Sequence, residues 1–68
     1  MKLLSPKEFN NLLLPENISV KAYEACIDIF ITGNTILDVC IVHGIKEDEE
    51  IRNLSKAIQT ILKQVLQQ

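Results

Sequence analysis

The sequence predicts an all-α fold, a small domain of about four helices. Apolar residues recur at intervals of three and four along most of the chain, which is the pattern of helices with one buried face. Proline or glycine stands between the apolar stretches, at Pro15, Gly33 and Gly44, where helices commonly end. A chain of 68 residues has room for one domain, so residues 1–68 are expected to form a single helical domain.

The first helix is expected near residues 5–14. Ser5 suits the N-cap position, because its hydroxyl can accept a hydrogen bond from the third amide of the helix. Glu8 can complete a capping box, and Pro6 suits the first helical position, where no amide hydrogen is needed. Pro15 is expected to end the helix, because a proline disfavours helical backbone in the residue before it.

The second helix is expected near residues 19–32, with its cap among residues 17–19 and with Gly33 as the residue that ends it. Helical spacing places five side chains on its apolar side: Val20, Tyr23, Ile27, Phe30 and Ile31. The opposite side carries a polar stripe: Lys21, Glu24 and Asp28.

Residues 26–42 also fit a β-hairpin, which would make the chain αββα. β-branched residues alternate on both sides of Gly33-Asn34, a pair that is common in hairpin turns. β-branched side chains lower helix propensity, whereas the polar stripe of the second helix favours a helix. The residues alone leave both arrangements open, with the helix favoured.

Two further helices are expected near residues 35–43 and 49–66. The shorter one can be capped by Asn34 or Thr35. The longer one contains no glycine or proline, and the acidic residues 47–50 at its start suit the positive end of the helix dipole. Its apolar stripe consists of Ile51, Leu54, Ile58, Ile61, Leu62 and Val65.

Residues 34–62 therefore have the order of a helix-turn-helix motif. Cys40 is the small residue that lets the second helix pack closely, Gly44 allows the turn, and Ile45 closes the core after it. In such motifs the second helix lies in the major groove of DNA.

The outward side of the last helix carries basic or amide side chains: Arg52, Asn53, Lys56, Gln59, Thr60 and Lys63. These are side chains that contact phosphates and base edges, so they are the candidate DNA-binding residues. A solvated helix face is usually polar as well, and the stripe by itself has this second explanation.

The ordered pattern of apolar, glycine and cysteine positions resembles that of PapB-type adhesin-biosynthesis transcription regulators. It consists of Leu4-Ser5, Phe9, Ile18, Ile27, Phe30, Gly33, Val39-Cys40 and Leu54. The family carries Glu-Val-Cys where this chain has Asp38-Val39-Cys40, and the similarity runs without gaps from Leu4 to Ile45. Residues 53–58 resemble the recognition helix of the related TrfB/KorA plasmid repressors.

The resemblance implies an all-helical fold, which favours the helix over the hairpin. It also implies a DNA-binding transcription regulator of a bacterial adhesin, fimbrial or plasmid operon, which binds AT-rich repeats cooperatively and can activate or repress. The chain departs from the family at the turn, where Glu47–Glu50 replace neutral or basic residues and the spacing from Gly44 is longer. These carboxylates would face phosphates unless the longer loop turns them away.

A protein-interaction module that pairs with another regulator and blocks it is the alternative function. The acidic turn and the net charge of −2 favour this alternative. Either function is expected to involve a homo-oligomer, because so short a chain buries only about 60% of its unfolded surface. The expected subunit contact is the end of the apolar stripe, with coverage by the first helix within one chain as the alternative: Ile61, Leu62, Val65 and Leu66.

Enzymatic, metal-binding and membrane roles are not expected. Cys40 and His43 lie on the apolar side of a short helix without oxyanion donors nearby, so a core histidine explains them better than a catalytic pair. Two cysteines and one histidine are too few for a zinc site. Cys26 and Cys40 are expected as small buried residues of a cytoplasmic protein, with a disulfide as the minor alternative. No cofactor or small-molecule substrate is expected.

Overall fold

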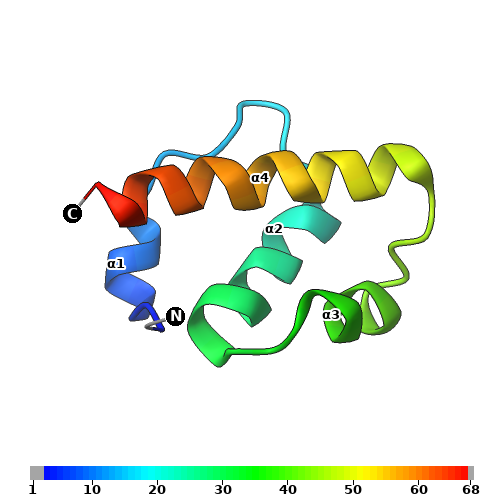
Figure 1. Ribbon diagram of the computed structural model, residues 1–68, viewed down its shortest axis with the longest axis horizontal. Coiled ribbons are helices and arrows are strands. Elements are labelled where there is room, and N and C mark those ends of the chain that lie inside the picture. Colours follow the sequence, from blue (N-terminus) through cyan, green and yellow to red (C-terminus); the bar gives the residue numbers. More distant parts are fainter. Residues whose placement is uncertain (1–2, 68) are drawn as a thin grey trace.

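A computed structural model describes residues 3–67 of the chain, and all regular secondary structure in this part is helical (Figure 1). The elements are α1 (Pro6–Asn10), α2 (Val20–Ile27), the π-helical η1 (Asp28–Thr32), α3 (Ile36–Val42) and α4 (Asp48–Leu66). No strand occurs between residues 3 and 67. The prediction of a small all-α domain is confirmed, and the alternative of a β-hairpin is wrong.

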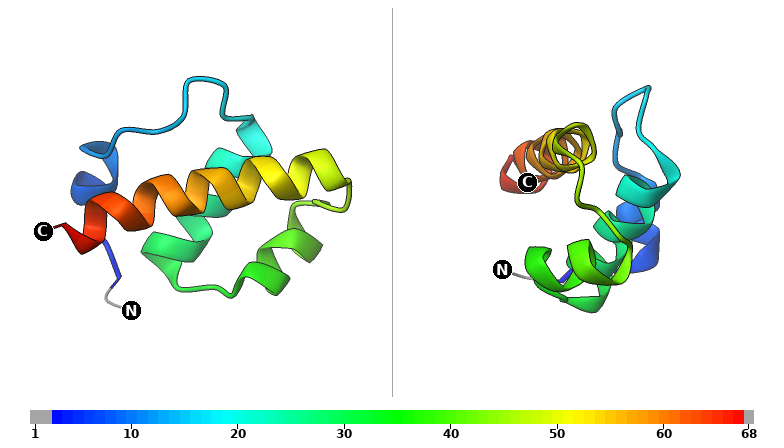
Figure 2. Two further views of the ribbon diagram at one scale, coloured as in Figure 1. Left: turned by 45° about the horizontal axis from the view of Figure 1, so that its top comes forward. Right: turned by 90° about the vertical axis from the view of Figure 1, so that its right-hand side faces the viewer.

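The core is built mainly between α2 and α4, which pack against each other and cross in Figure 1 and in the left view of Figure 2. α1 lies beside the C-terminal end of α4, and α3 packs against α2 and η1. The buried side chains are Leu4, Phe9, Ala22, Ala25, Cys26, Ile29, Phe30, Val39, Ile45, Leu54, Ala57 and Ile61.

Three hydroxyl side chains cap three helices, as the sequence indicates. The Ser5 hydroxyl accepts from the Glu8 amide at 3.1 Å, and the Glu8 carboxylate accepts from the Ser5 amide, which completes the capping box. Ser19 caps α2 and Thr35 caps α3 in the same way, each at 3.1 Å. These bonds satisfy amides at the helix starts that have no partner within the helix.

The first helix is shorter than expected, because α1 ends at Asn10 and not near residue 14. The backbone of Leu13 bonds to the side chain of Gln64 instead of continuing the helix. Its amide donates to Gln64 Oε1 at 2.8 Å, and its carbonyl accepts from Gln64 Nε2 at 2.6 Å. A contact with the far end of the chain therefore replaces the last helical turn.

The second helix extends to Thr32 as predicted, but its last five residues form the π-helix η1. The Asn34 amide donates to the Asp28 carbonyl at 2.9 Å, which closes a wide turn. Gly33 follows with a positive φ of 89°, the left-handed conformation expected of the residue that ends a helix. The β-branched residues of this segment, which favoured a hairpin, are thus accommodated in a widened helix end.

The four residues of the expected subunit contact differ in their exposure in the folded chain. Ile61 is 0% exposed and belongs to the core of the single chain, which corrects its assignment to a subunit contact. Leu62 and Val65 are half-buried against the same core, and Leu66 remains 81% exposed. The reason is that α1 and Leu12 lie along the C-terminal end of α4 and cover part of its apolar side.

The burial of Ile61 predicts a large effect of its truncation. Ile61→Ala should lower the free energy of unfolding by about 2–5 kcal/mol, because it leaves a cavity in the core. Leu66→Ala is the matched control on the same helix and should change it by about 0.5 kcal/mol or less. Urea unfolding followed by circular dichroism measures both, and equal effects of the two variants would contradict the burial of Ile61.

The two glycines with positive φ give a second prediction. Gly44, at φ 66°, has open space where a Cβ would lie, so Gly44→Ala should cost about 1–2 kcal/mol through its left-handed backbone alone. At Gly33 an added Cβ would also lie 3.2 Å from Leu3 Cδ2. Gly33→Ala should therefore destabilise the fold at least as strongly as Gly44→Ala in the same unfolding assay. A neutral Gly33→Ala would refute this account of the turn.

Candidate nucleic-acid interface

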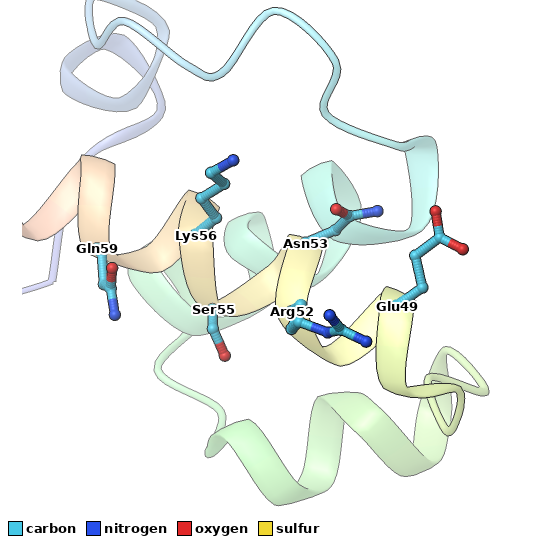
Figure 3. A pocket seen from close by; sticks show the side chains of 6 residues that line it. All are labelled: Glu49, Arg52, Asn53, Ser55, Lys56 and Gln59. Atoms are coloured by element: carbon cyan, nitrogen blue, oxygen red, sulfur yellow. The ribbon is translucent and has the colours of Figure 1, made fainter.

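The outward side of α4 carries most of the residues that the sequence singles out for DNA binding. Packing of Leu54 and Ala57 against α2 turns the opposite side of the helix to solvent. Five candidate side chains are exposed there: Arg52, Asn53, Lys56, Gln59 and Lys63. Figure 3 shows side chains of this face along a shallow groove whose walls all come from α4. This groove consists of gaps between side chains on a convex helix surface and is not an enclosed cavity.

Thr60 is placed differently from the other candidates. It is half-buried, and its hydroxyl donates to the carbonyl of Lys56 at 2.9 Å, so its own hydrogen is already used. Thr60, Asn53 and Lys56 face residues 13–18 across a hollow of about 490 Å³. These residues belong to the connection between α1 and α2 that stands beside α4 (Figure 2). Thr60 is therefore at the flank of the polar face and less suited to contact a large ligand.

Gln64 holds the connection between α1 and α2 beside the polar face. The paired hydrogen bonds between its amide and the backbone of Leu13 fix the start of this segment against α4. Gln64 was not among the sequence candidates, because an amide near the end of an amphipathic helix gives no sign of a partner 51 positions away. Its role here is to shape one edge of the interface.

The acidic run at the start of α4 is split between two directions. Glu50 turns toward α2, where its carboxylate accepts from Lys21 Nζ at 2.8 Å. The hydrogen bond from Lys21 is the main cause that lowers the pKa of Glu50 below its ordinary value of 4.5, and a bond from the Glu47 amide adds to it. The carboxylate of Glu50 is thus directed away from the outward side of α4.

Glu49 lies on the outward side together with Arg52, Asn53 and Lys56 (Figure 3). Helical spacing predicts this, because residues three, four and seven positions apart share one side of a helix. The face then carries the cations Arg52, Lys56 and Lys63 against the carboxylate of Glu49 and, at its N-terminal end, the exposed carboxylate of Asp48 four residues before Arg52. It is locally positive, although the whole chain has a net charge of −2.

The turn between α3 and α4 is held by one apolar residue and one histidine. Ile45 is buried, and its amide donates to the Cys40 carbonyl at 2.8 Å, so its predicted role in closing the core is confirmed. His43 Nε2 lies 2.6 Å from Asp28 Oδ2, and His43 Nδ1 lies 3.9 Å from Glu24 Oε2. These contacts fasten the end of α3 to α2 and η1. The histidine is a packing and hydrogen-bonding residue at this position.

The thiols and carboxylates give no further site in the described chain. Cys26 and Cys40 are free thiols, and burial raises the pKa of Cys26 to about 11, so that thiol stays protonated. No three histidine, cysteine or acidic residues within residues 3–67 are placed to hold a metal ion. No helix in the same range is long and apolar enough to cross a membrane.

Comparison of the chain with family models, with curated proteins and with solved structures found no match. The resemblance to PapB-type regulators therefore rests on the residues named above alone.

The lowered pKa of Glu50 predicts a pH-dependent contribution to stability. A carboxylate whose pKa is lower in the folded state stabilises the fold above its ordinary pKa of 4.5, and loses this effect as the pH falls through the lowered value. Glu50→Gln should therefore be less stable than wild type at pH 7, and this difference should shrink below about pH 4.5. Urea unfolding across this pH range measures it.

Lys21→Gln is the matched control for this ion pair. It should cause a similar loss at pH 7, and the double variant should lose little more than either single one, because both remove the same contact. Fully additive losses in the two variants would contradict the pairing of Lys21 with Glu50.

Proposed function

We propose that this chain is a DNA-binding transcription regulator that uses the outward side of α4 as its reading surface. The observation that carries the proposal is the charge separation on α4. Arg52, Lys56 and Lys63 are exposed on one side, whereas Glu50 is paired with Lys21 on another. The helix α4 carries equal numbers of acidic and basic residues, but the basic ones share its outward side, as a surface that binds phosphates requires.

The dimensions of α4 suit a major groove. At 1.5 Å per residue, the cations from residue 52 to residue 63 span about 16 Å along the helix. The major groove is about 12 Å wide and admits one α-helix, so cations along such a helix can reach phosphates at the groove edges. Asn53 and Gln59 lie between them and carry the amide groups that pair with adenine edges.

The resemblance supplies the biological context of the proposal. PapB-type regulators control adhesin or fimbrial operons, and the related plasmid repressors control plasmid operons, so an AT-rich operator bound by two or more copies is the proposed target. Glu49 is the feature that sets this chain apart, because its carboxylate shares the reading side and opposes phosphate contact. We infer weaker DNA binding than a neutral residue at this position would give.

A protein-interaction module is the second candidate function, and the surface of α3 favours it. Leu37, Ile41 and Val42 are exposed on this helix, where they offer apolar contacts and no contact to phosphates. In this alternative the chain would pair with a DNA-binding regulator and block it, and the polar side of α4 would be an ordinary solvated face.

A titration with fluorescently labelled AT-rich duplex at several salt concentrations separates the two functions. Wild type should bind with an affinity that falls as salt rises, because bound phosphates release counterions. Lys56→Gln should weaken binding to all sequences alike and reduce the salt slope by about one. Lys7→Gln, at an exposed lysine of α1, is the control and should leave both values unchanged.

Two further variants test the reading side itself. Asn53→Ala should relax the preference at one base pair, by about 1–3 kcal/mol, with little change in salt slope. Glu49→Gln should strengthen binding, since it removes a carboxylate from the phosphate-facing side. If wild type and Glu49→Gln both lack salt-dependent binding, the DNA-binding proposal fails and the protein-interaction module replaces it.

A further inference from the structure

The helix α3 leaves much of its apolar surface uncovered. Leu37, Ile41 and Val42 are 70–75% exposed, whereas Val39 is the buried residue of this helix. Single exposed apolar side chains are ordinary on protein surfaces, but several on one short helix form a patch of the kind found at protein contacts. A hollow of about 360 Å³ opens in this surface, which we call the α3 patch. The hollow is lined by Leu37, Cys40, Ile41, Gly44, Ile45 and Lys46.

Carboxylates border the α3 patch. Asp38 precedes Ile41 by three positions, so the two side chains are neighbours on the surface of α3. Glu47 and Asp48 are exposed and directly follow Lys46, which lines the hollow. None of the three carboxylates forms an ion pair within residues 3–67. Three carboxylates against the one amine of the lining leave the patch and its border with two negative charges in excess.

The start of α4 places Asp48 on the flank of that helix nearer to α3. Figure 3 shows the Ser55 side chain pointing to this flank, whereas Glu49 and Lys56 point to the opposite one. Asp48 precedes Ser55 by seven positions, which is about two turns of helix, so both side chains leave α4 on the same side. The carboxylate of Asp48 is therefore within reach of a molecule that covers the α3 patch.

We propose that the α3 patch binds an amphipathic helix of a partner protein, with aliphatic residues on one side and lysine or arginine on the other. One aliphatic side chain of that helix fills the hollow beside Leu37 and Ile41, and its cations pair with the bordering carboxylates. A helix suits such a patch, because anchors at intervals of three and four share one side of it. Addition of a peptide strand needs a sheet edge, and residues 3–67 contain no strand.

The border charges distinguish this occupant from others that an apolar patch could bind. Nucleic acid and acidic lipid surfaces would meet the same carboxylates, which repel phosphates. A second copy across a two-fold axis would bring two equally acidic borders together, and like charges disfavour such a contact. A cationic helix neutralises the border instead. The inference goes beyond the proposed function, because it concerns a different surface and holds whether or not α4 binds DNA.

A titration of the full chain with a synthetic peptide tests the proposal. The probe is a fluorescent peptide of about 18 residues, long enough to form a helix, with leucines at intervals of three and four and lysines between them. Wild type should bind this lysine peptide with an affinity that falls as salt rises. A matched peptide with glutamate in place of lysine has the same apolar side and should bind about 10-fold more weakly or less.

Substitutions on α3 and at its border locate the binding site. Ile41→Ser should weaken binding of the lysine peptide about 10-fold or more, because it removes one aliphatic contact. Leu66→Ser, at a similarly exposed residue of α4, is the matched control and should leave binding unchanged. Asp48→Asn should weaken binding about 2- to 5-fold, whereas Glu16→Gln, at an exposed carboxylate between α1 and α2, should not. Circular dichroism checks that all variants keep the helical fold.

The amide chemical shifts of wild type give a second readout that needs no substitution. The lysine peptide should shift the amides of residues 36–48 and leave those of residues 52–63 unchanged. Lys56→Gln should bind the peptide as wild type does, even where it weakens binding to DNA. Failure of the DNA-binding proposal and failure of this inference are thereby recognised separately.

Several outcomes would overturn the inference. One is the absence of saturable binding of the lysine peptide to the folded chain, and another is equal affinity for the glutamate peptide. Chemical shift changes that lie outside residues 36–48 would place the peptide on another surface. A wild-type dimer that Ile41→Ser dissociates would assign the α3 patch to a second copy of the chain instead.

Discussion

The close contact between α2 and α4 is the constraint on which the rest of the structure depends. Ala22, Ala25 and Cys26 on α2, and Ala57 on α4, are almost completely buried. Their small side chains let the two helix backbones approach closely, and larger apolar residues then fill the space around them. A longer side chain at any of these positions would separate the helices and uncover the rest of the core. The contact therefore sets both the position and the rotation of α4.

The rotation of α4 decides which of its residues reach solvent. Once Leu54 and Ala57 face α2, helical geometry leaves the side that carries Arg52 and Lys56 turned outward. The same packing brings the start of α4 near Lys21. The ammonium group of Lys21 pairs with the carboxylate of Glu50 and holds it away from the outward side. The positive character of that side is thus a consequence of how the core is packed, and the average charge of the chain hides it.

Much of this fold follows from local features of the sequence. Ser5, Ser19 and Thr35 cap helices, and Gly33 ends one, because the chemistry of capping and of positive φ involves neighbours a few residues away. The end of α1 was not predicted, because it depends on the contact between Leu13 and Gln64, which are far apart in the sequence. The burial of Ile61 within one chain was only the alternative to a subunit contact. Periodicity shows that a side chain is apolar and on a given side, but not which part of the chain covers it. For the same reason the sequence predicted which residues of α4 face outward. It did not predict that Thr60 lies at the flank of that side, opposite residues 13–18.

The two surfaces of the chain have opposite character, and the turn between them relates one to the other. α3 presents apolar side chains and α4 presents basic and amide side chains, and Ile45 and His43 fasten the segment that joins them. Because this five-residue turn is fastened, the fold of the single chain fixes the direction of the basic side of α4 relative to the apolar surface of α3. If α4 reads DNA, a partner bound at α3 is therefore held in a fixed direction relative to the reading helix, although no residue of the turn itself needs to touch a base.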